Sequence, residues 1–194
     1  MVASKFYMIS SMIFIIAYLG LIFFLLIFLF FMSLYTAFLI YSSFKGSPYV
    51  ATRKKVIKEI LEMANLKKGK VFYELGSGDG RVNRLAVKNW QVKAVGVDIN
   101  PLLVFWSNFL AKLQKLDKNC QFIRKNIFDI NYSKADYLYI FLMPDLIKKL
   151  TPKLKKELKK TCLIISHGFK IEDKGIKLIK VKEGKPFNTY YYRI

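Results

Sequence analysis

The longest run of hydrophobic positions lies near the start of the chain, where residues 6–44 hold no Asp, Glu, Lys, Arg or His. A helix needs about 20 apolar residues to cross the hydrocarbon core of a bilayer. This run therefore predicts a transmembrane anchor over residues 6–44. Because no polar turn interrupts residues 21–32, a single span is favoured over the alternative, a hairpin of two spans. The run is too long for the apolar region of a signal peptide.

After the anchor, short apolar runs alternate with polar segments. Residues 45–69 predict a linker that leads into a helix at Thr52–Leu66. From residue 70 to residue 194 we expect one domain in which strands and helices alternate. The predicted strands are Val71–Leu75, Val92–Asp98, Gln121–Arg124, Tyr137–Met143 and Cys162–Ser166. The predicted helices between them are Arg81–Asn89, Pro101–Leu116 and Leu146–Lys159.

This alternation predicts an α/β fold, in which a parallel sheet carries helices on both faces. The pattern changes after the fifth strand. Ile176–Lys182 and Phe187–Arg193 are both strand-like, and the turn residues Glu183–Pro186 join them. We therefore expect a Rossmann-like, mostly parallel sheet with a C-terminal antiparallel hairpin, preceded by the transmembrane helix.

The charged residues on either side of the anchor predict its orientation in the membrane. The chain has 33 Lys and Arg against 13 Asp and Glu, and every acidic residue follows the uncharged run. Only Lys5 stands before that run, whereas Lys45, Arg53 and Lys54 follow it closely. Loops rich in Lys and Arg remain on the cytoplasmic side of a membrane. We therefore expect a single-pass membrane protein whose domain faces the cytoplasm.

The cysteine content excludes a disulfide scaffold, because the chain has only Cys120 and Cys162. Both lie in apolar, strand-like runs. We expect them to be reduced residues of the core.

The net charge of +20 also predicts a basic surface. Seven lysines crowd the segment of the last predicted helix: Lys148, Lys149, Lys153, Lys155, Lys156, Lys159 and Lys160. Such a surface suits phosphates, of lipid or of nucleic acid. A nucleic-acid partner is disfavoured, because no aromatic residues are interleaved with these lysines and arginine is scarce. We expect an anionic lipid surface as the partner, and plain solvated lysines remain the alternative.

The segment Glu74-Leu75-Gly76-Ser77-Gly78-Asp79-Gly80 is the most informative part of the chain. It places a glycine-rich turn between a strand and a helix, where the backbone must bend sharply and a ligand can approach without a Cβ in the way. A dinucleotide fold would have its third glycine at the position of Arg81. A phosphate-binding P-loop would need Gly-Lys-Ser/Thr, which is absent. The acidic Glu74 suits an ammonium group instead of a pyrophosphate.

A second carboxylate, Asp98, ends the next predicted strand. A carboxylate at this place can accept hydrogen bonds from both ribose hydroxyls. Together, Glu74 and Asp98 indicate a ligand with an amino-acid end and a ribose. S-adenosylmethionine has both.

The segment Glu74–Gly80 resembles motif I of class I S-adenosylmethionine-dependent methyltransferases. From about Tyr49 to the C-terminus, the chain is similar to a group of small protein-lysine methyltransferases with an N-terminal membrane segment. The segments that carry this resemblance are Pro48–Thr52, Glu74–Val82, Gly96–Val104 and Ile140–Pro144. Eukaryotic members of that group modify proteins of the mitochondrial inner membrane. The resemblance implies the class I methyltransferase sheet and S-adenosylmethionine as cofactor.

The resemblance also implies which residues hold the cofactor. Motif I would line its methionine end, the end of the second strand would bind its ribose, and the segment after the third strand would hold its adenine. A strip before the domain would cover it. These residues are Tyr49, Thr52, Glu74, Gly76, Ser77, Gly78, Asp79, Gly80, Asp98, Ile99, Asn126 and Ile127. Asn126 departs from the acid that the group often has there, and a turn or capping residue is its alternative interpretation.

The edge of the substrate site is expected after the fourth strand, at Met143, Pro144 and Asp145. Asp145 could orient a substrate amine, or it could cap a helix. Methyltransferases of nucleic-acid bases have Asn or Asp, two prolines and an aromatic residue here, and Phe141–Pro144 lacks that pattern. His167 is the only histidine and could edge the site or be packed. No metal-binding cluster is visible in the sequence.

The sequence therefore predicts a membrane-anchored S-adenosylmethionine-dependent methyltransferase that acts on a lysine side chain of a protein. Its anchor would confine it to substrates at the membrane. One alternative is a methyltransferase for a membrane small molecule, such as a lipid or a quinone. The other is a non-catalytic protein of the same fold that binds membrane or nucleic acid through its basic surface.

Overall fold

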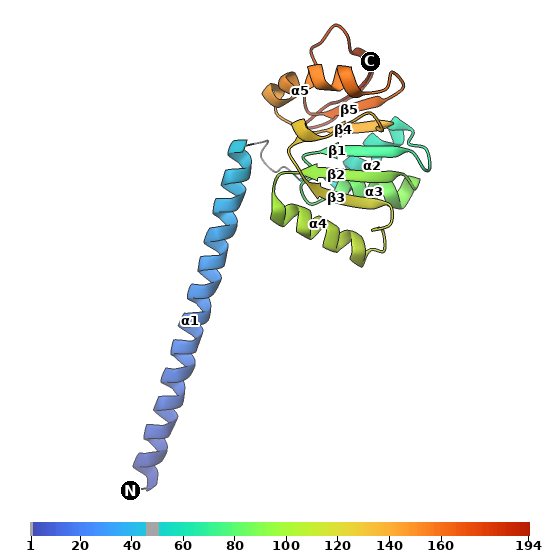
Figure 1. The fold of residues 1–194 in the computed structure, drawn as a ribbon. Coiled ribbons are helices and arrows are strands. Elements are labelled where there is room, and N and C mark those ends of the chain that lie inside the picture. The colour runs from blue at the N-terminus through green and yellow to red at the C-terminus, as the bar shows by residue number, and fades with distance from the viewer. Residues whose placement is uncertain (1, 46–50) are drawn as a thin grey trace. The chain divides into compact units, whose positions relative to one another are not determined.

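The structure, a computed structural model, describes residues 2–45 and 51–194, with the backbone alone for residues 2–10, 38–39 and 41–45 (Figure 1). The chain divides into two compact units, one that ends at Tyr41 and one that runs from Ser42 to Ile194. Each unit is described by itself below.

The described part of the first unit belongs to a single helix, α1 (Val2–Lys45), whose last four residues are counted with the second unit. Its section Ser11–Ala37 is long and apolar enough to cross a membrane, and its large apolar side chains are exposed. Because the helix is uninterrupted, the hairpin alternative is wrong. An all-round apolar surface, with no polar face, is what a helix surrounded by lipid requires.

The second unit is built on a seven-stranded sheet with the order β3-β2-β1-β4-β5-β7-β6. Its first five strands are β1 (Val71–Leu75), β2 (Lys93–Asp98), β3 (Cys120–Arg124), β4 (Tyr137–Ile140) and β5 (Leu163–His167), and they pair in parallel. The last two are β6 (Lys177–Lys182) and β7 (Thr189–Arg193). Because β7 runs antiparallel between β5 and β6, the predicted mostly parallel sheet with a terminal hairpin is confirmed.

Helices cover both faces of the sheet and enclose two hydrophobic clusters. One cluster includes residues of α2 (Lys54–Ala64), α3 (Arg81–Trp90) and α4 (Pro101–Leu113). The other includes residues of α5 (Pro144–Glu157). Cys120 belongs to the first cluster and Cys162 to the second; both are buried and free of disulfides, which confirms that they are core residues.

Several predicted boundaries were wrong by a few residues. β4 ends at Ile140 instead of Met143, because the chain leaves the sheet there and Pro144, which has no N–H to give to a ladder, begins α5. The irregular segment after β3 contains a short 3₁₀ helix, η1 (Ile127–Asp129). Since α5 ends at Glu157, two of the seven lysines assigned to this helix, Lys159 and Lys160, lie beyond it.

Candidate functional site

The site lies at the carboxyl edge of the sheet, where β1, β2 and β4 end side by side. The register places Glu74 of β1 between Gly96 of β2 and Tyr139 of β4. Side chains at the ends of adjacent parallel strands meet at one edge, which is where open α/β sheets bind ligands. The glycine-rich turn begins directly after Leu75, the last residue of β1.

The glycines of the turn hold a backbone conformation that other residues rarely adopt. Gly76, Gly78 and Gly80 have φ angles of 72°, 53° and 73°. The backbone N–H groups of Gly76 and Ser77 donate to the carbonyl of Val97 on β2, at 2.8 and 3.0 Å. These bonds hold the turn against the end of β2, so that it opens onto the same edge as Asp98.

Asp98 connects the glycine turn to the turn after β2. Its Oδ2 accepts a hydrogen bond from the Gly78 N–H at 2.8 Å, and its Oδ1 accepts one from the Asn100 N–H at 2.9 Å. Burial raises the pKa of the Asp98 carboxyl, while the backbone amides of Asn100, Gly78 and Ile99 oppose that rise. A carboxylate oxygen has two acceptor sites, so each oxygen can accept one further hydrogen bond from a ligand.

Glu74 is a buried carboxyl group with an unused acceptor. Only 5% of the residue is exposed, and no donor among the described residues contacts its Oε2. Burial raises the pKa of Glu74 well above its usual value, and the negative charges of Asp79 and Asp98 add to this. A positively charged group of a ligand would act in the opposite direction and favour the carboxylate.

Asp79 orders the turn through Arg81, which was not among the predicted site residues. Both oxygens of Asp79 accept hydrogen bonds from Arg81, the closest at 2.7 Å. Burial alone would raise the pKa of Asp79, but the paired Arg81 holds it below its usual value. Nη1 of Arg81 also donates to the carbonyl of Thr52 at 3.2 Å. Arg81 thereby connects the glycine turn to Thr52 in the strip before the domain. Tyr49, the other predicted residue of that strip, lies outside the described residues.

The segment expected to hold the adenine follows β3 and forms a short capped helix. Asn126 follows β3, and its side-chain oxygen accepts a hydrogen bond from the Phe128 N–H at 3.1 Å. The capping interpretation of Asn126 is therefore confirmed, with Ile127 beginning η1. Ile99 is half-buried in the turn after Asp98. Contacts of Asn126, Ile127 and Ile99 with a cofactor remain predictions.

The expected edge of the substrate site is exposed. Met143, Pro144 and Asp145 are all solvent-exposed where β4 leads into α5. The position that caps α5 is Met143, and Asp145 lies in the first turn of the helix, so the capping interpretation of Asp145 is wrong. Two positions before Met143, the Phe141 ring packs against His167 and Phe187, with ring centroids 4.7 and 5.4 Å apart. These three rings form an aromatic wall that includes the end of the segment leading to the exposed residues.

His167 is packed and does not edge an open site. It is the last residue of β5, only 3% exposed, and its Nδ1 lies 2.9 Å from the Thr189 hydroxyl. Burial, aided by the charge of Lys182, lowers the pKa of His167 to about 4. The imidazole is therefore neutral near pH 7, and it contributes shape and a hydrogen bond to the aromatic wall.

The lowered pKa of His167 makes stability depend on pH. Between pH 6.5 and pH 4 the unfolded chain binds a proton that the folded chain excludes, so the free energy of unfolding falls as the pH falls through this range. We expect His167 to account for roughly 2–3 kcal/mol of the loss between pH 7 and pH 4.5. Urea unfolding of the detergent-solubilised chain and of His167→Gln at both pH values measures this. An equal loss in both proteins would contradict it.

Three buried residues of the site were not predicted from the sequence. Asn83 of α3 is fully buried, and neither atom of its side-chain amide has a partner among the described residues. Ser107 of α4 donates to the Gly78 carbonyl at 3.0 Å. Phe122 of β3 fills the space beside Gly80 and Gly96. A usable signal existed for Asn83, because it shares the buried face of α3 with Ala86 and Val87, where a polar residue is unusual.

These features together fit a ligand with an amino-acid end and a ribose. The glycine turn leaves room for close approach, Glu74 offers an unpaired buried oxygen, and Asp98 keeps free acceptor sites. Among the residues that the structure describes, no group of His, Cys, Asp and Glu could hold a metal ion. The hydrogen-bond acceptors of the site therefore match the ammonium and ribose hydroxyls of S-adenosylmethionine, as the sequence predicted.

Comparisons with known proteins agree with this fit. Residues 74–176 match a family described as the ANTKMT methyltransferase domain. A protein-lysine N-methyltransferase of Saccharolobus islandicus is 36% identical over 148 residues, which are 74% of this chain and 91% of that protein. An adenine nucleotide translocase lysine N-methyltransferase of Mus musculus is 29% identical over 63% of this chain. The match spans about half, 53%, of the Mus musculus protein.

Among solved structures, an RNA methyltransferase from Salinibacter ruber in complex with S-adenosyl-L-homocysteine is similar, with a TM-score of 0.71 and 28% identity. The match covers 75% of this chain and 94% of that one. The fold, the glycine turn with its two carboxylates and the family match lead to one conclusion. The chain belongs to the ANTKMT methyltransferase domain family of class I S-adenosylmethionine-dependent methyltransferases.

Proposed function

We propose that this protein transfers a methyl group from S-adenosylmethionine to a lysine side chain of a membrane-associated protein. The observation that carries the proposal is the unpaired, buried Oε2 of Glu74 beside the glycine turn, within a domain whose relatives methylate protein lysine. The predicted domain at residues 70–194 would hold the cofactor through ten of the twelve residues named above, and the other two, Tyr49 and Thr52, would cover it from the strip before the domain.

The chain's own groups would bind and orient the reactants. Bound S-adenosylmethionine supplies a methyl group on a sulfonium. Glu74 would accept hydrogen bonds from the cofactor's ammonium, and Asp98 would accept them from its ribose hydroxyls. Since both carboxyls are buried, these bonds would form with little competition from water. Fixed placement of this kind accelerates a direct displacement.

The lysine substrate must be neutral when it attacks, although its usual pKa is about 10.4. An apolar environment lowers the pKa of a lysine, because it disfavours the ammonium form. The aromatic wall of Phe141, His167 and Phe187 would supply such surroundings, since Phe141 lies two positions before the exposed Met143 in the chain. We assign Met143, Pro144 and Asp145 to the rim of the substrate site on this ground.

The helix α1 would anchor the enzyme and restrict it to substrates at the same membrane. Support comes from the section Ser11–Ala37, whose length and composition suit a span. The excess of lysine and arginine after this helix favours a cytoplasmic domain. The lysines around α5 are a weaker lipid surface than expected, because Lys153, Lys155 and Lys159 pair with Glu157, Asp173 and Asp136.

The function is tested by supplying S-adenosylmethionine with a labelled methyl group to the full-length protein and to membrane fractions. We expect label in protein, recovered as methyl-lysine after hydrolysis, and none when Asp98→Ala replaces the wild type. Asp117→Ala is a matched control, because Asp117 is an exposed acid between α4 and β3. Label in lipid alone, or in nucleic acid alone, would show that the lysine proposal is wrong.

A further inference from the structure

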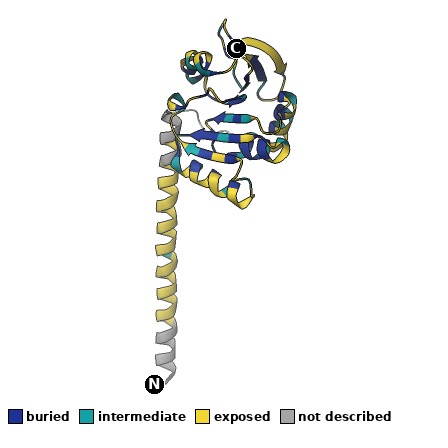
Figure 2. Ribbon diagram, turned by 45° about the vertical axis from the view of Figure 1, so that its right-hand side comes forward, coloured by how far each residue is buried: buried dark blue, intermediate teal, exposed yellow. Residues whose placement is uncertain are grey.

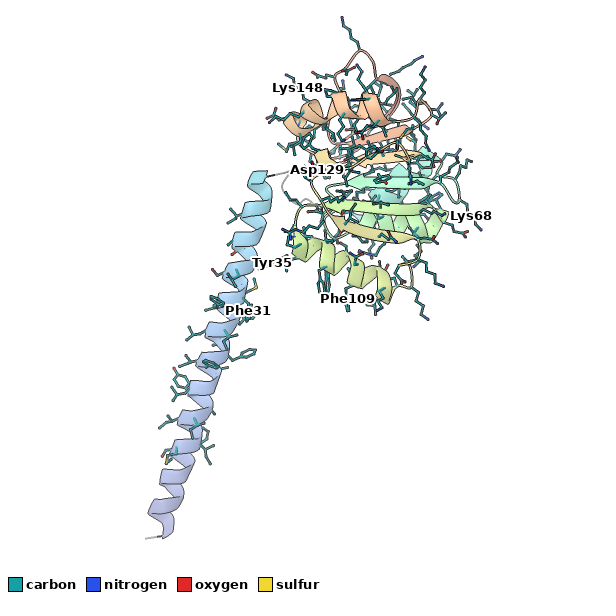
Figure 3. The ribbon with its side chains drawn as sticks, viewed as in Figure 1. Phe31, Tyr35, Lys68, Phe109, Asp129 and Lys148 are labelled. Atoms are coloured by element: carbon teal, nitrogen blue, oxygen red, sulfur yellow. The ribbon has the colours of Figure 1, made fainter. Side chains whose placement is uncertain are left out.

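Helix α4 has two apolar faces, and only one of them packs on the domain. Val104, Ser107 and Ala111 are buried on the inner face. The outer face carries five large apolar side chains that are 47–70% exposed: Leu102, Phe105, Trp106, Phe109 and Leu113. At 100° per residue these five fall within an arc of about 100°. Figure 2 shows α4 exposed along this side, and in Figure 3 the labelled Phe109 points away from the sheet.

This outer face is the reverse of what a helix on a soluble domain presents to water. Such helices normally carry charged and polar residues on the side opposite the core. A contiguous exposed apolar patch marks a surface that something else covers. Trp106 and Phe109 are also stacked on one another, with centroids 5.6 Å apart, so the face presents a continuous aromatic surface.

The chemistry of the face and of its surroundings fits a bilayer. Helices that lie in the membrane interface combine Trp, Phe and Leu on one side with lysines that reach the headgroups. Residues 99–116 contain no acidic side chain, and the exposed Lys112, Lys115 and Lys118 follow at the C-terminal end of α4. These lysines complement anionic headgroups.

If α1 spans a membrane, the short connection between α1 and α2 would also keep the domain close to the bilayer. Residues 46–53 connect α1 to α2, and eight fully extended residues reach at most about 28 Å. If α1 crosses the membrane as proposed, the domain stays near the lipid surface at a high effective concentration. A second copy or a protein substrate has no comparable argument on this surface.

We propose that the outer face of α4 inserts at the boundary between headgroups and acyl chains and fixes the orientation of the domain on the membrane. The helix follows Asp98 closely, since it begins at Pro101, and Asn100 caps it by accepting from the Leu102 and Leu103 N–H groups at 3.0 and 3.3 Å. Docking of α4 therefore brings the cofactor edge of the sheet to the membrane surface. The proposal rests on the proposed anchoring by α1, but it does not depend on methyl transfer.

The two tryptophans of the chain allow a direct test, because they are Trp90 and Trp106. In the full-length Trp90→Phe variant, Trp106 is the sole tryptophan. We expect lipid with brominated acyl chains, in vesicles of phosphatidylcholine and phosphatidylglycerol, to quench its fluorescence and the emission to be blue-shifted. Adding Phe105→Ser and Phe109→Ser should reduce the quenching at least threefold, because both side chains are exposed and contribute to insertion.

The matched control moves the tryptophan to the opposite edge of the sheet. Ile179 lies on β6, is 47% exposed, and β6 and β3 are the two edge strands. In Trp90→Phe/Trp106→Phe/Ile179→Trp we expect little quenching. Equal quenching at both places would overturn the proposal. So would a Trp106 shift that needs high protein-to-lipid ratios, which indicates self-association, or one that needs an added membrane protein, which indicates a docking site for that protein.

Binding of S-adenosylmethionine keeps the two proposals separate. Every variant should bind it as the wild type does, since none alters the glycine turn or its carboxylates, and unchanged binding also shows that the domain is folded. Loss of methyl transfer with normal quenching would count against the proposed function alone. Normal methyl transfer without quenching would count against the docking of α4 alone.

Discussion

Replacing Asp98 by alanine is expected to weaken S-adenosylmethionine binding at least 100-fold. The cofactor would lose two ribose hydrogen bonds to a charged acceptor, each worth about 1.5–3 kcal/mol, whereas a 100-fold loss corresponds to only about 2.7 kcal/mol. The same change releases the Gly78 and Asn100 N–H groups, which Asp98 now holds at 2.8 and 2.9 Å. Isothermal titration of the full-length protein with S-adenosylmethionine measures the loss.

Two further variants separate the causes of that loss. Asp98→Asn keeps the shape of the side chain but leaves a single acceptor oxygen, so it should also bind poorly, because one of the two backbone N–H groups loses its acceptor. Asp117→Ala, at an exposed position, should bind within threefold of the wild type. If Asp98→Ala also stayed within threefold, the assignment of Asp98 to the ribose would be wrong.

The sequence predicted the parts of the site that depend on local chemistry. Gly76, Gly78 and Gly80 have the positive φ angles that a sharp strand-to-helix turn requires. Asp98 ends β2 and faces that turn, as its place after an apolar strand indicated. Both predictions rest on residues close together in the chain, and the parallel strand order then brings the two strand ends to one edge.

The parts that were missed depend on packing between distant segments. Arg81 contacts the carbonyl of Thr52, which lies 29 positions earlier, and no local pattern encodes that contact. His167 is neutral near pH 7 because burial, aided by the charge of Lys182, lowers its pKa to about 4, and both effects come from segments distant in the chain. The fourth strand was predicted to run from Tyr137 to Met143, but β4 ends at Ile140. The prediction was too long because Phe141–Met143 is apolar, like a buried strand, but packs outside the sheet's hydrogen-bond ladder.

Helix α4 shows a different limit of sequence reasoning. Its apolar residues were sufficient to predict a helix, but they lie on both sides of it, so the pattern alone does not say which side faces the core. The structure resolves this, because the small residues Ser107 and Ala111 are buried and the large aromatic residues are exposed. Close packing of α4 on β3 leaves no space for large aromatic side chains on the inner face.

Gly80→Ala is expected to reduce the free energy of unfolding by about 3 kcal/mol. Gly80 has a φ of 73°, which costs an alanine about 1–2 kcal/mol. The added Cβ would also lie 2.3 Å from Cζ of Phe122, and forced overpacking costs about 1–3 kcal/mol. The Phe122 ring is closely fitted here, since it also packs against Gly96, where an added Cβ would lie 2.4 Å from its Cδ1. Thermal unfolding should show a Tm lower by about 9 °C.

Gly69 supplies the matched control that separates strain from overlap. It has a similar φ of 77°, but a Cβ there would meet nothing within 4 Å. Gly69→Ala should therefore lose only the part due to backbone strain, about 1–2 kcal/mol. In a Phe122→Leu background the shorter side chain removes most of the overlap, so Gly80→Ala should cost little more than Gly69→Ala does. Equal costs of Gly80→Ala in the two backgrounds would mean that Phe122 does not account for the requirement for glycine at position 80.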